Sequence, residues 1–262
     1  MLKQTIKLST AIVAGLALSA CGSGSNDTTA NQDPQGFWRG TTNTSGYDLA
    51  SVVLENGDYY SLYAKDGIVV GANYGKLSVT GNTYTGTLED IYVPNNQTNS
   101  GTISGTFVPK STLQGVSVYN DSKVGGFTTT YRNSYDTPAT LSAIVGVYSG
   151  PIYRSAATAT LTIDQNGLVN GTTISPSESP LPKCIITGNV VPRASGKNVY
   201  DLTLAWSDNP DPNAPKCCRP GSTICATDTP KAGIAVVDST YLYTAWINAA
   251  KTSGFLWRGA KQ

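Results

Sequence analysis

The sequence lacks histidine altogether, and its charged residues are few. Without histidine, the chain has no Ser-His-Asp or Cys-His catalytic group, no histidine-ligated zinc or haem, and no histidine pH switch. Charged residues make up 13% of the chain, against about 25% in an average soluble protein. The 18 basic and 17 acidic residues leave a formal net charge of +1, without the high basicity of nucleic-acid-binding domains. We therefore predict no nucleic-acid partner and no cofactor.

Phenylalanine and methionine are also scarce, with four residues of the first and one of the second. In their place it has 27 glycines and 15 tyrosines, a mixture of turn formers and residues of high β-propensity that favours an all-β fold. Residues 157–164 alternate apolar with polar side chains, which predicts a half-buried strand. Asn56-Gly57, Asp66-Gly67 and Asn166-Gly167 predict type I′ hairpin turns. Over the whole chain we expect roughly fourteen to sixteen strands.

Four anchors recur in both halves in the same order, which indicates a tandem duplication. They are Gly36-Phe37-Trp38-Arg39-Gly40 with Gly146-Val147-Tyr148-Ser149-Gly150, Asn56-Gly57 with Asn166-Gly167, residues 103–111 with 186–195, and residues 120–127 with 248–255. Each copy should form an antiparallel β-barrel or β-sandwich lobe, over residues 36–140 and 141–262, joined by a turn or two of helix at 139–145. The anchor spacing predicts extra hairpins or loops at residues 59–100 in the first copy and 207–230 in the second.

The N-terminus has the pattern of an export signal. Lys3 and Lys7 give a basic start, and residues 8–18 form a short apolar core. That core is too short for a membrane-spanning helix, which needs about 20 apolar residues. We interpret residues 1–20 as a signal peptide.

The signal ends in Leu18-Ser19-Ala20-Cys21, which resembles the lipobox of bacterial lipoproteins. The resemblance implies cleavage before Cys21 and lipid attached to it, and Gly22 in place of aspartate implies the outer membrane, facing the periplasm or the cell surface. The alternative is an ordinary secretory signal with a chance cysteine. Residues 22–34 contain no large apolar residue, so residues 21–35 should be a flexible, lipidated tether.

The other cysteines are Cys184, Cys217, Cys218 and Cys225. An even number in an exported chain predicts disulfides. A bond between the adjacent cysteines needs a strained ring, so Cys184 should pair with one member of the doublet and Cys225 with the other. A zinc site of four thiolates is the alternative, but the doublet departs from the usual ligand spacing, and we predict no metal.

The lipobox, the Gly36-x-Trp38-x-Gly40 opening and the block at residues 184–202 resemble a family of exported proteobacterial lipoproteins. The resemblance covers nearly all of the mature chain and implies a surface or periplasmic β protein with no catalytic residues to transfer. In that family, cysteines are common near Cys184 and near the doublet, and this chain adds a second pair. The Gly36-x-Trp38 opening is also similar to those of lipocalins and avidins, eight-stranded barrels around small ligands. A tryptophan that fills the end of a barrel is the simpler interpretation of Trp38.

Two pairs of carboxylates are candidates for acid–base catalysis: Glu55 with Asp58, and Glu89 with Asp90. Glycosidases hold two such groups roughly 5–9.5 Å apart inside a cleft. Glu55 and Asp58 flank a turn, where acidic side chains are ordinarily solvated. Residues 208–213 contain several oxygen donors of the kind that bind calcium, but they lack the turn glycine of calcium loops and contain two prolines. We therefore interpret them as a solvated loop.

The tyrosines Tyr59, Tyr60, Tyr63 and Tyr74 form the candidate contact surface, since tyrosine supplies rigid amphipathic area at binding sites. The alternative is cross-strand aromatic pairing. We predict a non-enzymatic, lipid-anchored binding or structural module of the bacterial envelope, with a protein, glycan or small ligand as partner. The alternative is an envelope hydrolase that uses paired carboxylates. An apolar cleft with two facing carboxylates would favour the hydrolase, and an interior filled with side chains would favour the non-enzymatic module. Ligand-holding barrels must leave interior room, whereas structural ones must not.

Overall fold

The computed structural model describes residues 33–43, 45–95, 97–153, 157–175, 181, 183–215, 217, 231–247 and 254–262. All of them belong to one compact unit. The signal peptide, Cys21 and most of the tether lie outside the described residues, as do Cys218 and Cys225. No helix in the described ranges combines the length and the apolar character needed to span a bilayer.

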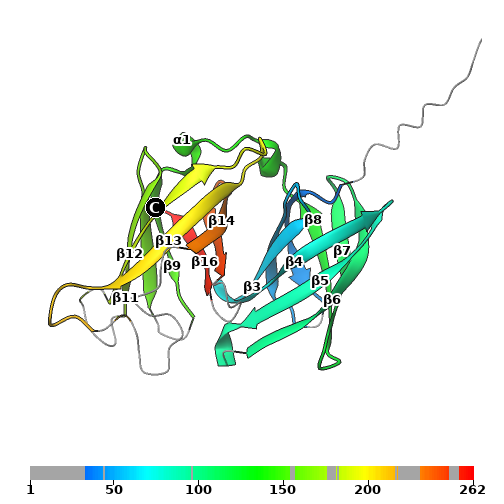
Figure 1. Ribbon diagram of the computed structural model, residues 1–262, viewed down its shortest axis with the longest axis horizontal. Helices are drawn as coiled ribbons and strands as arrows, with labels where there is room; N and C mark the ends of the chain where they lie inside the picture. Colours follow the sequence, from blue (N-terminus) through cyan, green and yellow to red (C-terminus); the bar gives the residue numbers. More distant parts are fainter. Residues whose placement is uncertain are drawn as a thin grey trace, which may run out of the picture. The chain divides into compact units, whose positions relative to one another are not determined.

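Two closed antiparallel barrels make up the described fold (Figure 1). The first barrel contains β1 (Gly36–Thr42), β2 (Asp48–Val53), β3 (Asp58–Lys65), β4 (Ile68–Thr80), β5 (Thr83–Tyr92), β6 (Gln97–Val108), β7 (Thr112–Tyr119) and β8 (Val124–Tyr131). The second barrel contains β9 (Gly146–Pro151), β10 (Thr158–Ile163), β11 (Leu168–Ile174), β12 (Cys184–Pro192), β13 (Tyr200–Asp208), β14 (Lys231–Val237), β15 (Tyr241–Ile247) and β16 (Gly254–Lys261). Within each barrel, strands that are adjacent in sequence pair with each other. The barrels close where β8 pairs with β1 and where β16 pairs with β9. The predicted tandem all-β fold is confirmed, and its lobes are barrels rather than sandwiches.

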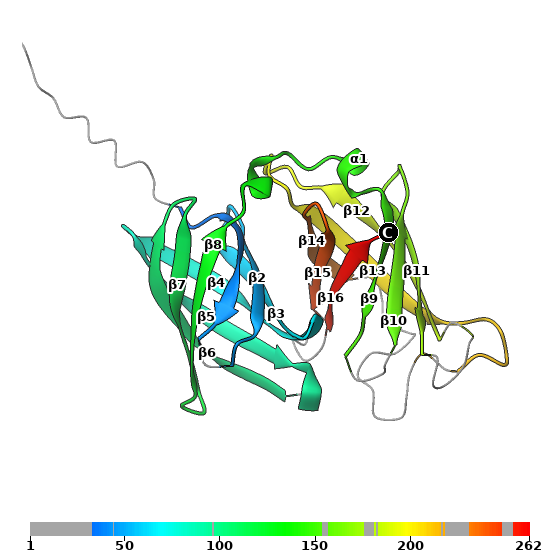
Figure 2. The same ribbon diagram turned by 180° about the vertical axis from the view of Figure 1, so that it is seen from behind.

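Short helical turns lie in the connections between some of the strands. The 3-10 helix η1 (Val93–Asn95) joins β5 to β6, while η2 (Asn133–Asp136) and α1 (Leu141–Ile144) lie on the connection from β8 to β9, with α1 over the second barrel (Figure 2). Thr140 caps α1, because its side chain accepts a hydrogen bond of 3.3 Å from the Ala143 backbone N–H. The predicted turn of helix between the copies is confirmed.

The hairpin turns follow the prediction in part. At Asp66-Gly67 both residues have positive φ, 51° and 82°, as a type I′ turn requires. At Asn56-Gly57 and Asn166-Gly167 only the glycine has positive φ, and its N–H donates to the carbonyl of Leu54 or Asp164, 3.0 Å away in each case. These are type I turns followed by a left-handed glycine, so the type I′ prediction is wrong there.

The repeat anchors fall on corresponding strands in three of the four cases. β1 corresponds to β9, the two Asn-Gly turns both follow the second strand of a barrel, and Phe127 and Phe255 lie on β8 and β16. Residues 103–111 begin on β6, however, whereas residues 186–195 begin on β12, the fourth strand of the second barrel. That match is wrong, and the first barrel has no extra hairpin at residues 59–100. The long connection predicted at 207–230 lies between β13 and β14.

Trp38 and Tyr148 occupy equivalent places in the two barrels. Both have 0% of their surface exposed. Trp38 Nε1 donates to the carbonyl of Pro34 at 3.0 Å, and the Tyr148 hydroxyl donates to the carbonyl of Ile144 at 2.9 Å. Each bond reaches four residues back along the chain, so one end of each barrel is closed in the same way. The interpretation of Trp38 as a barrel plug is confirmed.

The barrels share a core where β1 to β4 of the first pack against β14 and β15 of the second. Buried members from both sides include Val52, Leu62, Ile234 and Tyr243. Arg39 crosses this boundary: its guanidinium donates a hydrogen bond to the Tyr243 hydroxyl and lies 3.7 Å from the Asp238 carboxylate. Burial of apolar side chains from both barrels stabilises this packing by about 25 cal/mol for each Å² of apolar surface removed from water.

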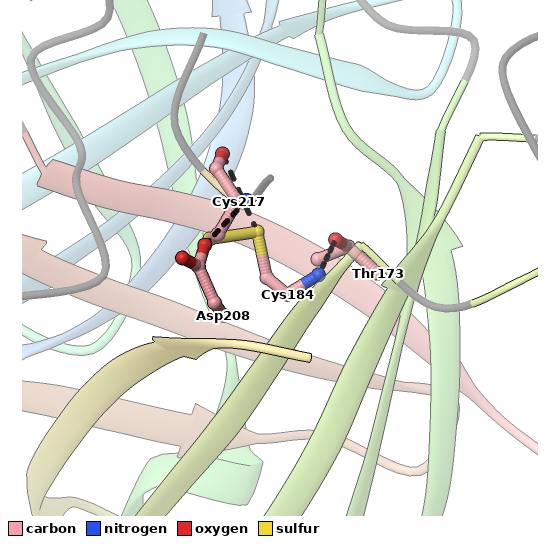
Figure 3. Close-up of a disulfide and its surroundings, with 4 residues drawn as sticks. All are labelled: Thr173, Cys184, Asp208 and Cys217. Atoms are coloured by element: carbon pink, nitrogen blue, oxygen red, sulfur yellow. Dashed lines mark hydrogen bonds between the residues drawn. A yellow bond between two sulfur atoms is a disulfide. The ribbon is translucent and has the colours of Figure 1, made fainter. Parts of the chain in front are cut away.

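A disulfide joins Cys184 to Cys217 (Figure 3). It connects the first residue of β12 to the segment that follows β13. Hydrogen bonds fix both ends, since Cys184 N donates to Thr173 Oγ1 at 3.2 Å and Cys217 N donates to Asp208 Oδ1 at 2.8 Å. The predicted bond from Cys184 to the doublet is confirmed, with Cys217 as the member that pairs.

Candidate functional site

The first barrel contains a cavity of about 720 Å³ at one end. Its lining comes from β1, β3 to β8 and the loops at this end, and it includes Tyr47, Tyr63, Asn73, Asp90, Tyr92, Tyr119 and Gly125. We call this cavity the cup. A smaller cavity of about 60 Å³ lies deeper, and its lining shares Asn73, Tyr119 and Gly125 with the cup. The cup lies within the range of known ligand pockets, roughly 300–1,000 Å³.

The cup exists because small side chains point inward on this side of the barrel. Ser51, Ser61, Ser117 and Gly125 line the deeper cavity, and the Ser51 and Ser61 hydroxyls bond each other at 2.5 Å. At the plugged end, large side chains fill the same interior: Trp38, Tyr84, Phe107 and Leu113. The barrel interior therefore changes from an apolar core to a polar space along its length.

The described interior of the second barrel is filled instead. Its core contains Trp206, Trp246, Phe255 and Trp257. Ring centroids lie 5.3 Å apart for Trp206 and Trp246, 5.1 Å for Trp206 and Phe255, and 5.7 Å for Phe255 and Trp257. Aromatic contacts of this kind pack a barrel interior with side chains.

Asp90 is the buried carboxylate of the cup. Its side chain points inward from β5, and the residue is 9% exposed. Asp90 Oδ1 accepts hydrogen bonds from the Tyr63 hydroxyl at 2.8 Å and from Asn73 Nδ2 at 2.5 Å. Burial raises the pKa of Asp90 to about 6, although the two hydrogen bonds act in the opposite direction. The group therefore changes charge close to neutral pH.

Tyrosine rings form much of the wall of the cup. Tyr63 stacks between Tyr47 and Tyr92, with centroid distances of 5.7 Å and 6.4 Å. The Tyr119 hydroxyl accepts from Asn73 Nδ2 at 3.4 Å. Burial and the neighbouring Asp90 raise the pKa of Tyr63 far above its usual value, so its phenol remains a neutral donor at physiological pH.

The four tyrosines predicted as one contact surface point in different directions. Tyr63 lines the cup, and Tyr59 lines the deeper cavity, where its hydroxyl donates to the Thr87 carbonyl at 3.1 Å. Tyr60 and Tyr74 are cross-strand partners on the outside of the barrel. Tyr60 packs against the core shared by the barrels. A single tyrosine face is therefore not formed, because neighbours along a strand point to opposite sides.

The predicted carboxylate pairs do not face each other across a cavity. Asp90 points into the barrel, so Glu89, the preceding residue of β5, points outward. Glu55 is exposed and pairs with Arg193 at 2.8 Å, while Asp58 lies 3.8 Å from Lys76. In the described ranges, no three Asp, Glu or Cys side chains gather as a metal site.

The sequence did not single out Tyr47, Asn73 or Tyr119. A usable signal for Asp90 was present, because Tyr84, Leu88 and Asp90 alternate with the other residues of β5 and so point to the same side, and Tyr84 and Leu88 are large side chains of high sheet propensity. Asn73 and Tyr119 lie on other strands, and their proximity to Asp90 depends on the register of β4 and β7. The register between paired strands cannot be predicted from the local sequence pattern.

No family model matches the chain, and no curated protein matches it. Among solved structures, it is similar to the crystal structure of the isotype 1 transferrin-binding protein B from serogroup B Neisseria meningitidis. The identity is 10%, the TM-score is 0.30, and the match covers 82% of this chain and 58% of that one. Similarity at this level is too low to assign a function, and the resemblance to exported lipoproteins stays a prediction.

Proposed function

We propose that this chain is a non-enzymatic, lipid-anchored binding module of the bacterial envelope, with its ligand site in the cup of the first barrel. The observation that carries the proposal is the contrast between the barrels. The first leaves a cavity of about 720 Å³ at one end, whereas tryptophan and phenylalanine rings fill the described interior of the second. A barrel that only has to be stable gains from filling its interior, because empty space costs packing energy.

Binding fits the chemistry of the cup better than hydrolysis does. Asp90 is its buried carboxylate, and the other acidic residue of the lining, Asp121, is exposed and lies 2.6 Å from Lys123 in an ion pair. A glycosidase needs two carboxyl groups with different protonation states on either side of the scissile bond. The cup instead offers one buried carboxylate, amides, hydroxyls and aromatic rings, the groups that fix the orientation of a bound ligand.

The chain enters the first barrel at the end opposite the cup. Strand β1 begins at the plugged end, where Trp38 bonds Pro34, and ends at Thr42, which lines the cup. The tether that precedes Gly36 therefore joins the first barrel at its plugged end.

Gly125 offers a direct test of the cup. An ideal Cβ built there meets Tyr119 Cε2 at 3.9 Å, an ordinary contact, so Gly125→Trp should fill the space without disturbing the backbone. Thr128→Trp is the matched control, because Thr128 lies on the same strand with its side chain exposed.

We would release each protein from the envelope in mild detergent and weigh it by native mass spectrometry. Wild type and Thr128→Trp should carry a small bound molecule that Gly125→Trp has lost. The same bound mass in Gly125→Trp, or no bound molecule in any of the three proteins, would count against the proposal.

A further inference from the structure

Building on the proposed cup, we propose that its ligand carries a primary ammonium group, which Asp90 binds through Oδ2 while tyrosine rings surround the charge. The inference names the ligand class of the same site, so it depends on the proposed function. It follows from three properties of the cup: hydrogen-bond capacity, charge and aromatic walls.

The first property is unused acceptor capacity on Asp90. Both donors that reach the side chain, Tyr63 Oη and Asn73 Nδ2, bond Oδ1. Within the described part of the chain, no hydrogen bond to Oδ2 is found. A carboxylate accepts at both oxygens, so Oδ2 has the capacity to accept from a donor that enters the cup. Asp90 is 9% exposed and lines the cup, so a ligand in the cup is positioned to supply the donor.

The second property is an uncompensated negative charge. The hydrogen-bond donors to Asp90 are a phenol and an amide, both neutral. Lys123 supplies the positive charge of the cup lining, but it is exposed and already paired with Asp121. A buried carboxylate without a cationic partner is costly. An ammonium group on the ligand would remove that cost, whereas an anionic ligand would add to it.

The third property is the ring of tyrosines. Tyr47, Tyr63, Tyr92 and Tyr119 all line the cup. The faces of aromatic rings are electron-rich and attract cations within about 6 Å of the centroid. A primary ammonium group uses both features, because its N–H groups reach a carboxylate oxygen while its charge lies against the rings. A quaternary ammonium group has no N–H to donate to Oδ2.

The test uses n-butylammonium as the probe and n-butanol as its uncharged counterpart of similar size. Binding to the whole mature protein is followed by the 13C resonance of the Asp90 carboxyl, which is assigned by its loss in Asp90→Asn. Tyrosine ring resonances provide a second signal that remains in the variant. Asp58→Asn is the matched control, because it removes the same charge from an exposed position outside the cup.

We expect a saturable shift with n-butylammonium in wild type and in Asp58→Asn. The apparent affinity should be at least about tenfold weaker for n-butanol, and for n-butylammonium in Asp90→Asn. Equal affinity for the two probes, unchanged affinity in Asp90→Asn, or no saturable response in wild type would overturn the inference.

The Gly125→Trp protein separates failure of the inference from failure of the proposed function. If n-butanol binds wild type as well as n-butylammonium does, and Gly125→Trp abolishes both, the cup binds ligands but the ammonium class is wrong. If neither Gly125→Trp nor Asp90→Asn affects the bound molecule or the probe, the cup itself is not the binding site.

Discussion

Tyr63 on β3 donates a hydrogen bond of 2.8 Å to Asp90 on β5, across the intervening strand β4. The bond is able to cross because β4 carries Gly71 at the crossing point. A Cβ at that position would collide with the Tyr63 hydroxyl and with the carbonyl of Ile91. The glycine is therefore part of the site, although it makes no hydrogen bond through a side chain.

Replacement of Gly71 by alanine should displace the Tyr63 ring and break its bond to Asp90. Forcing an extra methyl group into a packed interior typically costs about 1–3 kcal/mol, so the free energy of unfolding should fall by about that amount in urea titrations. Gly125→Ala is the control, because a Cβ there makes an ordinary contact, 3.9 Å from Tyr119 Cε2, and it should not destabilise the protein. Equal stability of the two variants would contradict this role of Gly71.

Asp90 should make stability depend on pH in an unusual direction. Its pKa in the folded protein, about 6, lies above the ordinary 3.8, so between these values the folded state binds more protons than the unfolded state. The contribution of Asp90 to stability should therefore fall as pH rises from about 4 to 6, by at most about 3 kcal/mol. The groups that face it, Tyr63, Asn73 and Tyr119, do not titrate in that window, because burial raises the pKa values of both tyrosines.

Urea titrations of wild type and Asp90→Asn at pH 4.5 and 7.5 measure this effect. The difference in free energy of unfolding between the two proteins removes the contribution of the other carboxylates, which both proteins share. Relative to wild type, Asp90→Asn should be more stable at pH 7.5 than at pH 4.5, although the substitution removes the carboxylate proposed to bind the ammonium group. A stability difference that does not change with pH would show that the carboxyl of Asp90 titrates at its ordinary value.

The Cys184–Cys217 disulfide should stabilise the second barrel. It closes a loop with a sequence separation of 33 residues, for which the chain-entropy relation gives about 3–4 kcal/mol. Cys184→Ser should lower the free energy of unfolding by up to that amount. Peptide mapping without reduction should find Cys184 joined to the peptide that contains Cys217 and Cys218. A free thiol at Cys184 in exported protein would disprove the bond.

Cys21 should carry lipid, as the Leu18-Ser19-Ala20-Cys21 motif predicts. Labelled palmitate should enter the wild-type protein in growing bacteria, and Cys21→Ser should lose the label and leave the membrane fraction. Cys184→Ser serves as the control for a cysteine outside the lipobox. Equal labelling of wild type and Cys21→Ser would refute the anchor.

Local pattern predicted the fold well, because strands and turns are largely local features. The alternation at residues 157–164 predicts β10, and the Asn-Gly pairs predict where hairpins lie. Turn type was harder to predict, because it depends on competing hydrogen bonds. At Asn166-Gly167, Asp164 Oδ1 accepts from two backbone N–H groups at 2.8 Å, which favours the type I turn.

The position of the cup was not predictable from local pattern, because it depends on the sum of inward side-chain volumes at one level of a barrel. Ser51 and Ser117 come from strands that are far apart in sequence, and their effect appears only when the barrel closes. The same limit applies to Asp90. It stood beside Glu89 as a candidate pair, yet strand alternation separates the two and brings Asp90 to Asn73 instead.

The most direct test of the central claim is a crystal structure of the protein purified from its native envelope without unfolding. We expect density for a bound molecule in the first barrel, with a nitrogen within hydrogen-bond distance of Asp90 Oδ2, and a second barrel filled by Trp206, Trp246 and Trp257. A cup that contains only water, or a ligand bound elsewhere on the protein, would contradict the claim.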